Sequence, residues 1–187
     1  MTDALPPGHW LRTAALHTPA AIRANPCPVP ASRGIYAWFF RDLFPGIQPA
    51  DRLTRDGHTL LYVGIAGSTP TSTRTLRKRL TTHCNENAYR STLRYSLGAL
   101  LVDDLGLRPT FPYKQQRPIF EGETRLSEWL KDNARIAWHE TPQPREAERQ
   151  LIAALDLPLN LEGNHRHPFH PTLTAARKAL GRPARPQ

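Results

Sequence analysis

One carboxylate lies on the apolar face of a helix. The sequence predicts a helix over residues 144–155, since a proline opens it and an apolar repeat of helical spacing follows. On that helix Glu148 shares a face with Leu151 and Leu155. Burying an uncompensated carboxylate costs several kcal/mol, so Glu148 needs a cation. The pattern leaves open whether that cation is an arginine or a metal ion. Glu146 falls about 200° away and is predicted to face water.

A second helix, predicted over residues 73–84, carries an arginine and a histidine on its inward face. Arg79 and His83 follow Leu76 at intervals of three and seven residues, which places them on one stripe. An arginine there can stabilise negative charge on a phosphate. The alternative is that Arg79 lies at the edge of the stripe and extends its guanidinium to solvent.

Two tyrosines occupy matching positions in two predicted strands, residues 34–40 and 60–65. Side chains alternate between the faces of a sheet, so Tyr36 lies opposite the face of Ile35, and Tyr62 lies opposite the face of Leu61 and Val63. If the apolar residues face the core, both tyrosines point to the other side. Tyrosine is also a common strand residue, which explains either one alone.

Together these residues could hydrolyse a phosphodiester. One carboxylate can hold a hard cation through oxygen, one arginine can bind the phosphate, and tyrosine or histidine can transfer protons. No second acidic residue follows at close spacing, so one divalent ion is a simpler expectation than two.

The elements that must position these residues form an α+β pattern. Two strands come first, helices follow, and a third strand precedes the last helices, which indicates a small antiparallel sheet with helices packed on it. Besides those named above, we expect helices over residues 17–24, 91–102, 123–133 and 172–180, a strand over 135–140, a loop over 106–120, and a disordered tail at 181–187.

Composition favours a basic protein of one domain. The chain has 187 residues and a net charge of +9, mostly from arginine, whose planar donors match phosphate oxygens. The charge alone does not decide between nucleic-acid binding and a host genome that favours arginine codons. No apolar run approaches the ~20 residues that cross a bilayer. With no secretory signal, we expect no membrane association, a cytoplasmic location, and free thiols at Cys27 and Cys84.

Four separated motifs, taken in order, resemble the GIY-YIG nucleases. Residues 34–36 read GIY, residues 62–64 read YVG, residues 76–83 read LRKRLTTH, and Glu148 is followed by leucine, isoleucine and then PLN at 158–160. Each motif is weak alone, but the ordered set is specific. It predicts a nuclease domain over 34–160, a Pro/Ala-rich N-terminal extension over 1–33, and a C-terminal extension with a basic tail over 161–187.

The resemblance implies a three-stranded antiparallel sheet flanked by helices, and an endonuclease that cuts DNA with Mg²⁺ or Mn²⁺, with RNA not excluded. It makes Tyr36 the proton acceptor beside the attacking water, and Tyr62 a support for the nucleophile or phosphate. Because tyrosine has a pKa near ~10, the cation and an arginine would have to lower the pKa of Tyr36.

The remaining roles also come from the resemblance. Arg79 holds the phosphate, with His83 as its helper. Glu148 binds the metal, and Asn160 orders the site through hydrogen bonds. The alternative is a non-catalytic nucleic-acid-binding module that kept the fold, although such a module would be free to lose any of these residues.

Other basic residues are expected to contact DNA, and the chain leaves a homodimer or a partner protein open. The candidates lie in the long spacer between the first two strands, on the outer side of the 73–84 helix, and in the C-terminal extension: Arg41, Arg52, Arg55, Arg74, Arg77, Lys78 and Arg166. Histidines at 165, 167 and 170 are read as part of a structured loop or a phosphate contact rather than a zinc site, because no cysteine cluster accompanies them.

Overall fold

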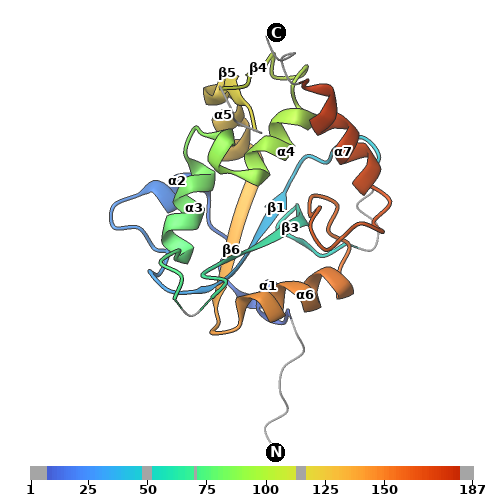
Figure 1. Cartoon of the computed structure of the whole chain (residues 1–187). Helices are drawn as coiled ribbons and strands as arrows, with labels where there is room; N and C mark the ends of the chain where they lie inside the picture. The colour runs from blue at the N-terminus through green and yellow to red at the C-terminus, as the bar shows by residue number, and fades with distance from the viewer. Residues whose placement is uncertain (1–7, 48–51, 70, 113–116, 182–187) are drawn as a thin grey trace, which may run out of the picture.

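An antiparallel sheet of four strands forms the centre of the molecule (Figure 1). The computed structural model describes residues 8–47, 52–69, 71–112 and 117–181. The strands are β1 (Gly34–Phe40), β2 (Thr54–Arg55), β3 (His58–Ala66) and β6 (Ala134–Glu140), in the order β2-β3-β1-β6. The α+β class and the flanking helices are as predicted, but the expectation of three strands is wrong by one.

The additional strand forms because a tight hairpin turn joins β2 to β3. Asp56 and Gly57 between them both have positive φ, 48° and 72°. That conformation is typical of the two-residue turns that match the twist of a hairpin, and Asp-Gly is a preferred sequence for them. Arg55 pairs with His58, and Thr54 with Thr59. The Asp-Gly pair was therefore a readable signal for β2.

Helices cover both faces of the sheet. Helices α1 (Trp10–Thr13) and α6 (Pro144–Ala154) lie on one face, where Leu11 and Leu151 pack against Ile35, Ala37 and Phe39. The other face carries five helices, namely α2 (Pro19–Arg23), α3 (Leu76–Cys84), α4 (Thr92–Leu100), α5 (Glu123–Asn133) and α7 (His170–Ala179).

The prediction that both tyrosines share the face opposite Ile35 is confirmed, because Tyr36 and Tyr62 pack in one cluster and Ile35, Ala37, Phe39 and Val63 in the other. Both faces are apolar and covered by helices, however. Tyr36, Trp38 and Phe40 belong to the larger apolar cluster, and every residue of β1 is buried. The register with β3 also shifts between Trp38 and Phe39. At this bulge Leu61 joins the cluster of Tyr36 instead of sharing a face with Val63.

Most predicted helix ends are confirmed to within a few residues, and caps explain the differences. The Thr75 hydroxyl accepts from the backbone N–H of Lys78, so α3 begins at Leu76 and not at residue 73. The Ser91 hydroxyl accepts from the N–H of Arg94 and caps α4, which follows the short 3-10 helix Ala88–Arg90. Helix α5 has the predicted bounds.

The stretch predicted as a loop contains a small hairpin instead. Strands β4 (Arg108–Thr110) and β5 (Ile119–Glu121) pair, with Pro109 opposite Phe120. Proline is tolerated where its missing N–H would face away from the partner strand, and each strand of a two-stranded hairpin has such an edge. Residues 113–116 and the tail from 182, predicted as loop and disordered, lie outside the described residues.

The N-terminal segment packs against both layers of the core. Leu11 contributes to the cluster under α6, whereas Ile22 contributes to the cluster on the tyrosine side. His17 and Ile136 exchange two backbone hydrogen bonds of 2.8 Å, which join the segment to β6. Within the described residues, no helix has the length and apolarity to cross a bilayer.

Candidate active site

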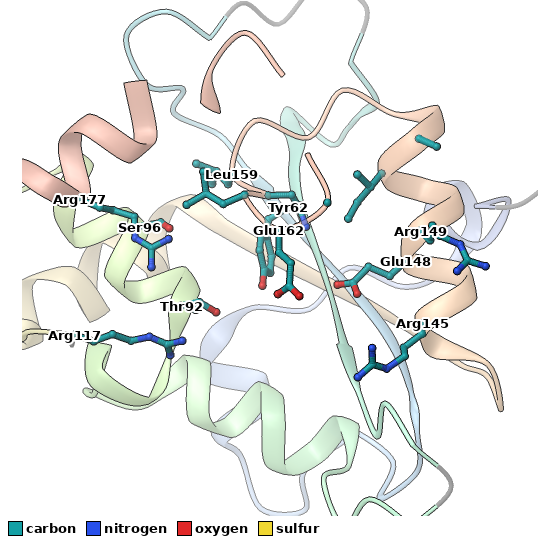
Figure 2. A pocket seen from close by; sticks show the side chains of 15 residues that line it. Tyr62, Thr92, Ser96, Arg117, Arg145, Glu148, Arg149, Leu159, Glu162 and Arg177 are labelled. Carbon is teal, nitrogen blue, oxygen red and sulfur yellow. The ribbon is translucent and has the colours of Figure 1, made fainter. Parts of the chain in front are cut away.

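The inward carboxylate of α6 borders a cavity of about 620 Å³. In Figure 2 Glu148 points from α6 toward Tyr62 and Glu162. Glu146 does not share this position, because it pairs with Arg149 and accepts a hydrogen bond from Gln150 one turn further along the outer side. The helical phase read from the sequence therefore separates the two carboxylates as expected.

Glu148 forms no ion pair with an arginine in the described part of the chain. Among the residues that the structure describes, no ion pair within 4.0 Å joins its carboxylate to a cation. Burial raises the pKa of Glu148 to about 7, the charge of Glu162 adds to the rise, and Arg145 and Arg79 oppose it. The salt-bridge alternative thus has no support, and a half-buried carboxylate with a raised pKa remains open to a cation.

The donor set suits a hard divalent cation. Glu148 and Glu162 offer carboxylate oxygens on one cavity wall, whereas no cluster of three histidine, cysteine or acidic side chains occurs in the described part of the chain. Mg²⁺ keeps several waters and is often held by one or two carboxylates with phosphate oxygens, so the set fits that ion. Sequence reasoning missed Glu162, since it follows the last motif by only two residues and has no helical phase to mark it.

A buried hydrogen-bonded chain runs from Tyr36 into the core. The Tyr36 hydroxyl lies 2.7 Å from Nε2 of His83, and Nδ1 of His83 lies 2.7 Å from the Ser91 hydroxyl. Burial lowers the pKa of His83 well below its ordinary value, and the charges of Arg79 and Arg94 add to the shift. His83 is therefore neutral near pH 7 and a weak base, and one of its ring nitrogens can accept a hydrogen bond from the Tyr36 hydroxyl.

Arg79 also binds the Tyr36 oxygen. Its Nε donates to the Tyr36 hydroxyl at 3.3 Å, and its Nη1 donates to the carbonyl of Arg90 at 3.4 Å. The guanidinium is thus held between the end of the 3-10 helix and the tyrosine, and it does not extend freely to solvent. Since Arg79 only donates, the proton of the Tyr36 hydroxyl is left for another acceptor, and His83 Nε2 is positioned to be one.

The two tyrosines differ in access. Tyr62 is half-buried and lines the cavity, whereas Tyr36 is fully buried behind it, with the two ring centroids 6.4 Å apart. Burial raises the pKa of Tyr36 well above its ordinary value, and Arg79 offsets this only in part. Arg79 lowers the pKa of Tyr36, as expected, but burial and Tyr62 raise this pKa by more, and the part assigned to a cation stays a prediction.

Gly64 is required by the close approach of Tyr36. The two residues are paired across β1 and β3, and the Tyr36 ring lies over the Gly64 backbone. A Cβ on Gly64 would come within 2.6 Å of the Tyr36 hydroxyl oxygen. The glycine of the second motif therefore has a steric purpose, since it leaves room for the tyrosine of the first.

Asn160 attaches the last motif to the sheet. Its side-chain oxygen accepts from the N–H of Val63 and its amide donates to the carbonyl of the same residue, both at 2.9 Å. Leu159 adds a backbone hydrogen bond to Leu61. Pro158-Leu159-Asn160 thus covers the edge of β3 beside Tyr62, which holds the segment leading to Glu162 against the cavity.

The basic residues predicted to contact DNA lie elsewhere. Within the described residues, none of the seven lines this cavity. Arg52 pairs with Asp156 at 2.8 Å, Arg55 donates to the carbonyls of Leu11 and Ala14, and Arg77 donates to that of Val29.

The other four predicted contacts, like Arg77, are exposed. Arg41 bonds Asn133 and its neighbour Asp42, and Lys78 donates to the carbonyl of Thr73. Arg74 and Arg166 are exposed. Contact of all seven residues with DNA stays a prediction.

A different set of arginines lines the cavity, from three separate segments: Arg117, Arg145, Arg149 and Arg177. Sequence reasoning missed them, except that Arg145 and Arg149 flank Glu148 on its own helix. Arg117 and Arg177 come from the β4–β5 hairpin region and from α7. No spacing rule connects such distant segments with the motifs.

Comparison with protein families agrees with this geometry. The model of the GIY-YIG catalytic domain matches residues 34–179, which spans the sheet, the tyrosines, Arg79, Glu148 and also α7. The chain therefore belongs to the GIY-YIG family, and this membership indicates nuclease-type activity on a nucleic acid. Comparisons with curated proteins and with solved structures found no significant match.

Proposed function

We propose that this protein is a metal-dependent endonuclease that hydrolyses phosphodiester bonds in DNA. The observation that carries the proposal is the position of Glu148, a carboxylate without an arginine partner that faces Tyr62 across the cavity. Its raised pKa and the nearby Glu162 mark a place where positive charge is lacking. A bound divalent cation, Mg²⁺ or Mn²⁺, would supply Lewis-acid polarisation of the phosphate and a more acidic water.

The residues around it would bind the substrate and handle the proton. Arg79, next to the Tyr36 oxygen, would bind a non-bridging phosphate oxygen and stabilise the charge that develops there. Tyr62, which lines the cavity, would orient the water or the phosphate. Asn160 would keep the wall of the cavity in place through its two bonds to Val63.

The proton would move along the buried chain. A water oxygen forms the new bond to phosphorus while the bond to the leaving strand breaks. The water proton passes to the Tyr36 oxygen, and the Tyr36 proton passes to Nε2 of His83, 2.7 Å away. The leaving oxygen takes its proton from solvent. In this scheme Tyr36 never carries a full negative charge, which fits its raised pKa, and the lowered pKa of His83 makes the protonated imidazole short-lived, so that His83 returns its proton through Tyr36 to solvent after the cut.

The test is a cleavage assay of Glu148→Gln with Glu146→Gln as its matched control. The two carboxylates lie two residues apart on one helix, but only Glu148 borders the cavity. On plasmid DNA with Mg²⁺, we expect Glu148→Gln to bind DNA at least as well as the unmodified protein and to cut at least about 10²-fold more slowly. Glu146→Gln should cut normally.

Two results would contradict the proposal. DNA binding without cleavage by the unmodified protein, in Mg²⁺ or Mn²⁺ and on plain, modified and branched DNA, would leave the non-catalytic binding module. Full activity of Glu148→Gln would assign the cation to other residues.

A further inference from the structure

Two arginines from distant segments lie at one end of the cavity. Arg177 extends from α7, and Arg117 lies just before β5 (Figure 2). In the part of the chain that the structure describes, no ion pair within 4.0 Å joins either guanidinium to a carboxylate. Two cations that share a cavity wall repel each other unless an anion lies between them.

Arg177 is held in place by the aromatic ring of Tyr95. Its guanidinium carbon lies 4.1 Å from the centroid of that ring, and the Tyr95 hydroxyl donates to the Arg177 carbonyl at 3.2 Å. Burial lowers the pKa of Arg177, Tyr95 opposes this shift, and the charge of Arg117 adds to it. The side chain is therefore positioned before any ligand arrives, at the cost of repulsion from Arg117.

The charges along the cavity alternate. Arg117 and Arg177 lie at one end, Glu162 and Glu148 lie in the middle beside Tyr62, and Arg145 lies beyond them (Figure 2). A cation in the middle with arginines beside it matches a polyanion that crosses the whole cavity. A single phosphate at the central carboxylates would leave the arginine pair without a partner.

We infer that Arg117 and Arg177 together bind a second backbone phosphate of the substrate strand, adjacent to the one that is cut. This inference rests on the proposed function and names the part of the substrate that the enzyme requires, namely a polynucleotide strand with at least one phosphate beside the scissile one. Arginine suits this purpose because its planar donors bind phosphate oxygens in pairs. Helix α7 is thereby part of the substrate-binding surface.

Neutral linkages in the DNA test this directly. A set of oligonucleotides, each with one uncharged methylphosphonate at a different position, is bound to the full chain in the presence of a chelator, so that no cutting occurs. For the unmodified protein, one position besides the scissile linkage should weaken binding about tenfold, the scale of a lost charge-assisted hydrogen bond. For Arg117→Gln/Arg177→Gln, binding should already be weaker, and that same position should have no further effect.

The control is Lys178→Gln, which removes one positive charge from an exposed neighbour on α7. It should reduce affinity slightly and keep the sensitivity to the neutral linkage. Because Arg177 packs on Tyr95, the single variant Arg117→Gln serves as a second test that does not touch this packing. It should show a smaller effect of the neutral linkage than the unmodified protein does.

A double variant that remains as sensitive to every neutral linkage as the unmodified protein would overturn the inference. The inference would also be overturned if inorganic phosphate displaced the oligonucleotide at an equal concentration of charge. Arg117 and Arg177 would then bind a free anion and not a strand. The assay needs no cleavage, so failure of the proposed function is distinguishable: the position effect would persist in a protein that never cuts DNA in Mg²⁺.

Discussion

Two sites in the protein each combine an arginine with an inward-facing glutamate. In one of them the two side chains form an ion pair, and in the other they do not. Arg94 and Glu123 are buried and form an ion pair of 3.1 Å between α4 and α5. Glu123 also accepts from the N–H of Ala88, and Arg94 also donates to the Ser127 hydroxyl. Arg79 and Glu148, in contrast, form no ion pair within 4.0 Å in the described part of the chain, and each affects the pKa of the other through charge alone.

We interpret the first as a structural site and the second as part of the proposed active site. At Arg94–Glu123 the protein supplies the counter-ion, so the charges hold helices together, although Nη1 of Arg94 has no hydrogen-bond partner in the described part of the chain. At Arg79–Glu148 the protein holds a cation and an anion apart, which leaves room for a substrate phosphate and a metal ion. Under the proposed function, the same residue types would give stability at one place and chemistry at the other.

Breaking the ion pair between Arg94 and Glu123 should have the largest effect, and that effect should be on the stability of the fold. Glu123→Ala leaves Arg94 buried without its counter-ion, so we expect a loss of about 3–5 kcal/mol in the free energy of unfolding. Urea denaturation at pH 7 measures this. Replacing both partners with leucine should recover much of the loss. A change below about 1 kcal/mol for Glu123→Ala would show that the pair is not the structural site we describe.

Replacing Arg79 should instead affect catalysis. Arg79→Ala should lower the rate of DNA cleavage about 10²–10³-fold, because it removes a positioned charge from the phosphate. Its free energy of unfolding should change little in comparison with Glu123→Ala. Single-turnover cleavage and urea denaturation of the same preparation provide both values. A normal cleavage rate would make Arg79 structural.

Removing one oxygen from the buried chain should affect turnover and spare binding. Tyr36→Phe keeps the ring over Gly64 but loses the hydroxyl between Arg79 and His83. We expect cleavage to slow about 10²-fold, the lower end for lost proton transfer. DNA affinity in chelator should be unchanged. A fully active Tyr36→Phe would transfer the proton-handling role to Tyr62, which is the tyrosine that lines the cavity.

The smallest effect should be a pH dependence at Glu148. The folded-state pKa of Glu148 is raised to about 7 by burial and Glu162, so this group stabilises the metal-free protein below its ordinary pKa and loses that contribution as pH rises through 7. Without metal, Glu148→Gln should match the Tm of the unmodified protein near pH 4.5 and exceed it at pH 8. Adding Mg²⁺ at pH 8 should raise only the Tm of the unmodified protein. A difference in Tm that is constant with pH would contradict the raised pKa.

Much of the site was predictable because helix and strand periods fix local direction. The 3.6-residue period separated Glu148 from Glu146, and it placed Arg79 and His83 on the inner side of α3. The residues that sequence reasoning missed have no such period relative to the motifs. Glu162 lies in a loop, and Arg117 and Arg177 lie on segments that meet the cavity only after the hairpin and α7 have packed.

By itself, the sequence determined the family, the order of the main helices and strands, and the residues that face inward on each. Local periodicity and capping depend on neighbours within a few residues, so a linear reading reaches them. The tertiary structure decided whether each inward charge found a partner. Glu123 pairs with Arg94, which is 29 residues away in the sequence, whereas Glu148 borders a cavity that a second carboxylate, Glu162, also lines. That outcome depends on contacts between distant segments, and these contacts separate a structural ion pair from a candidate active site.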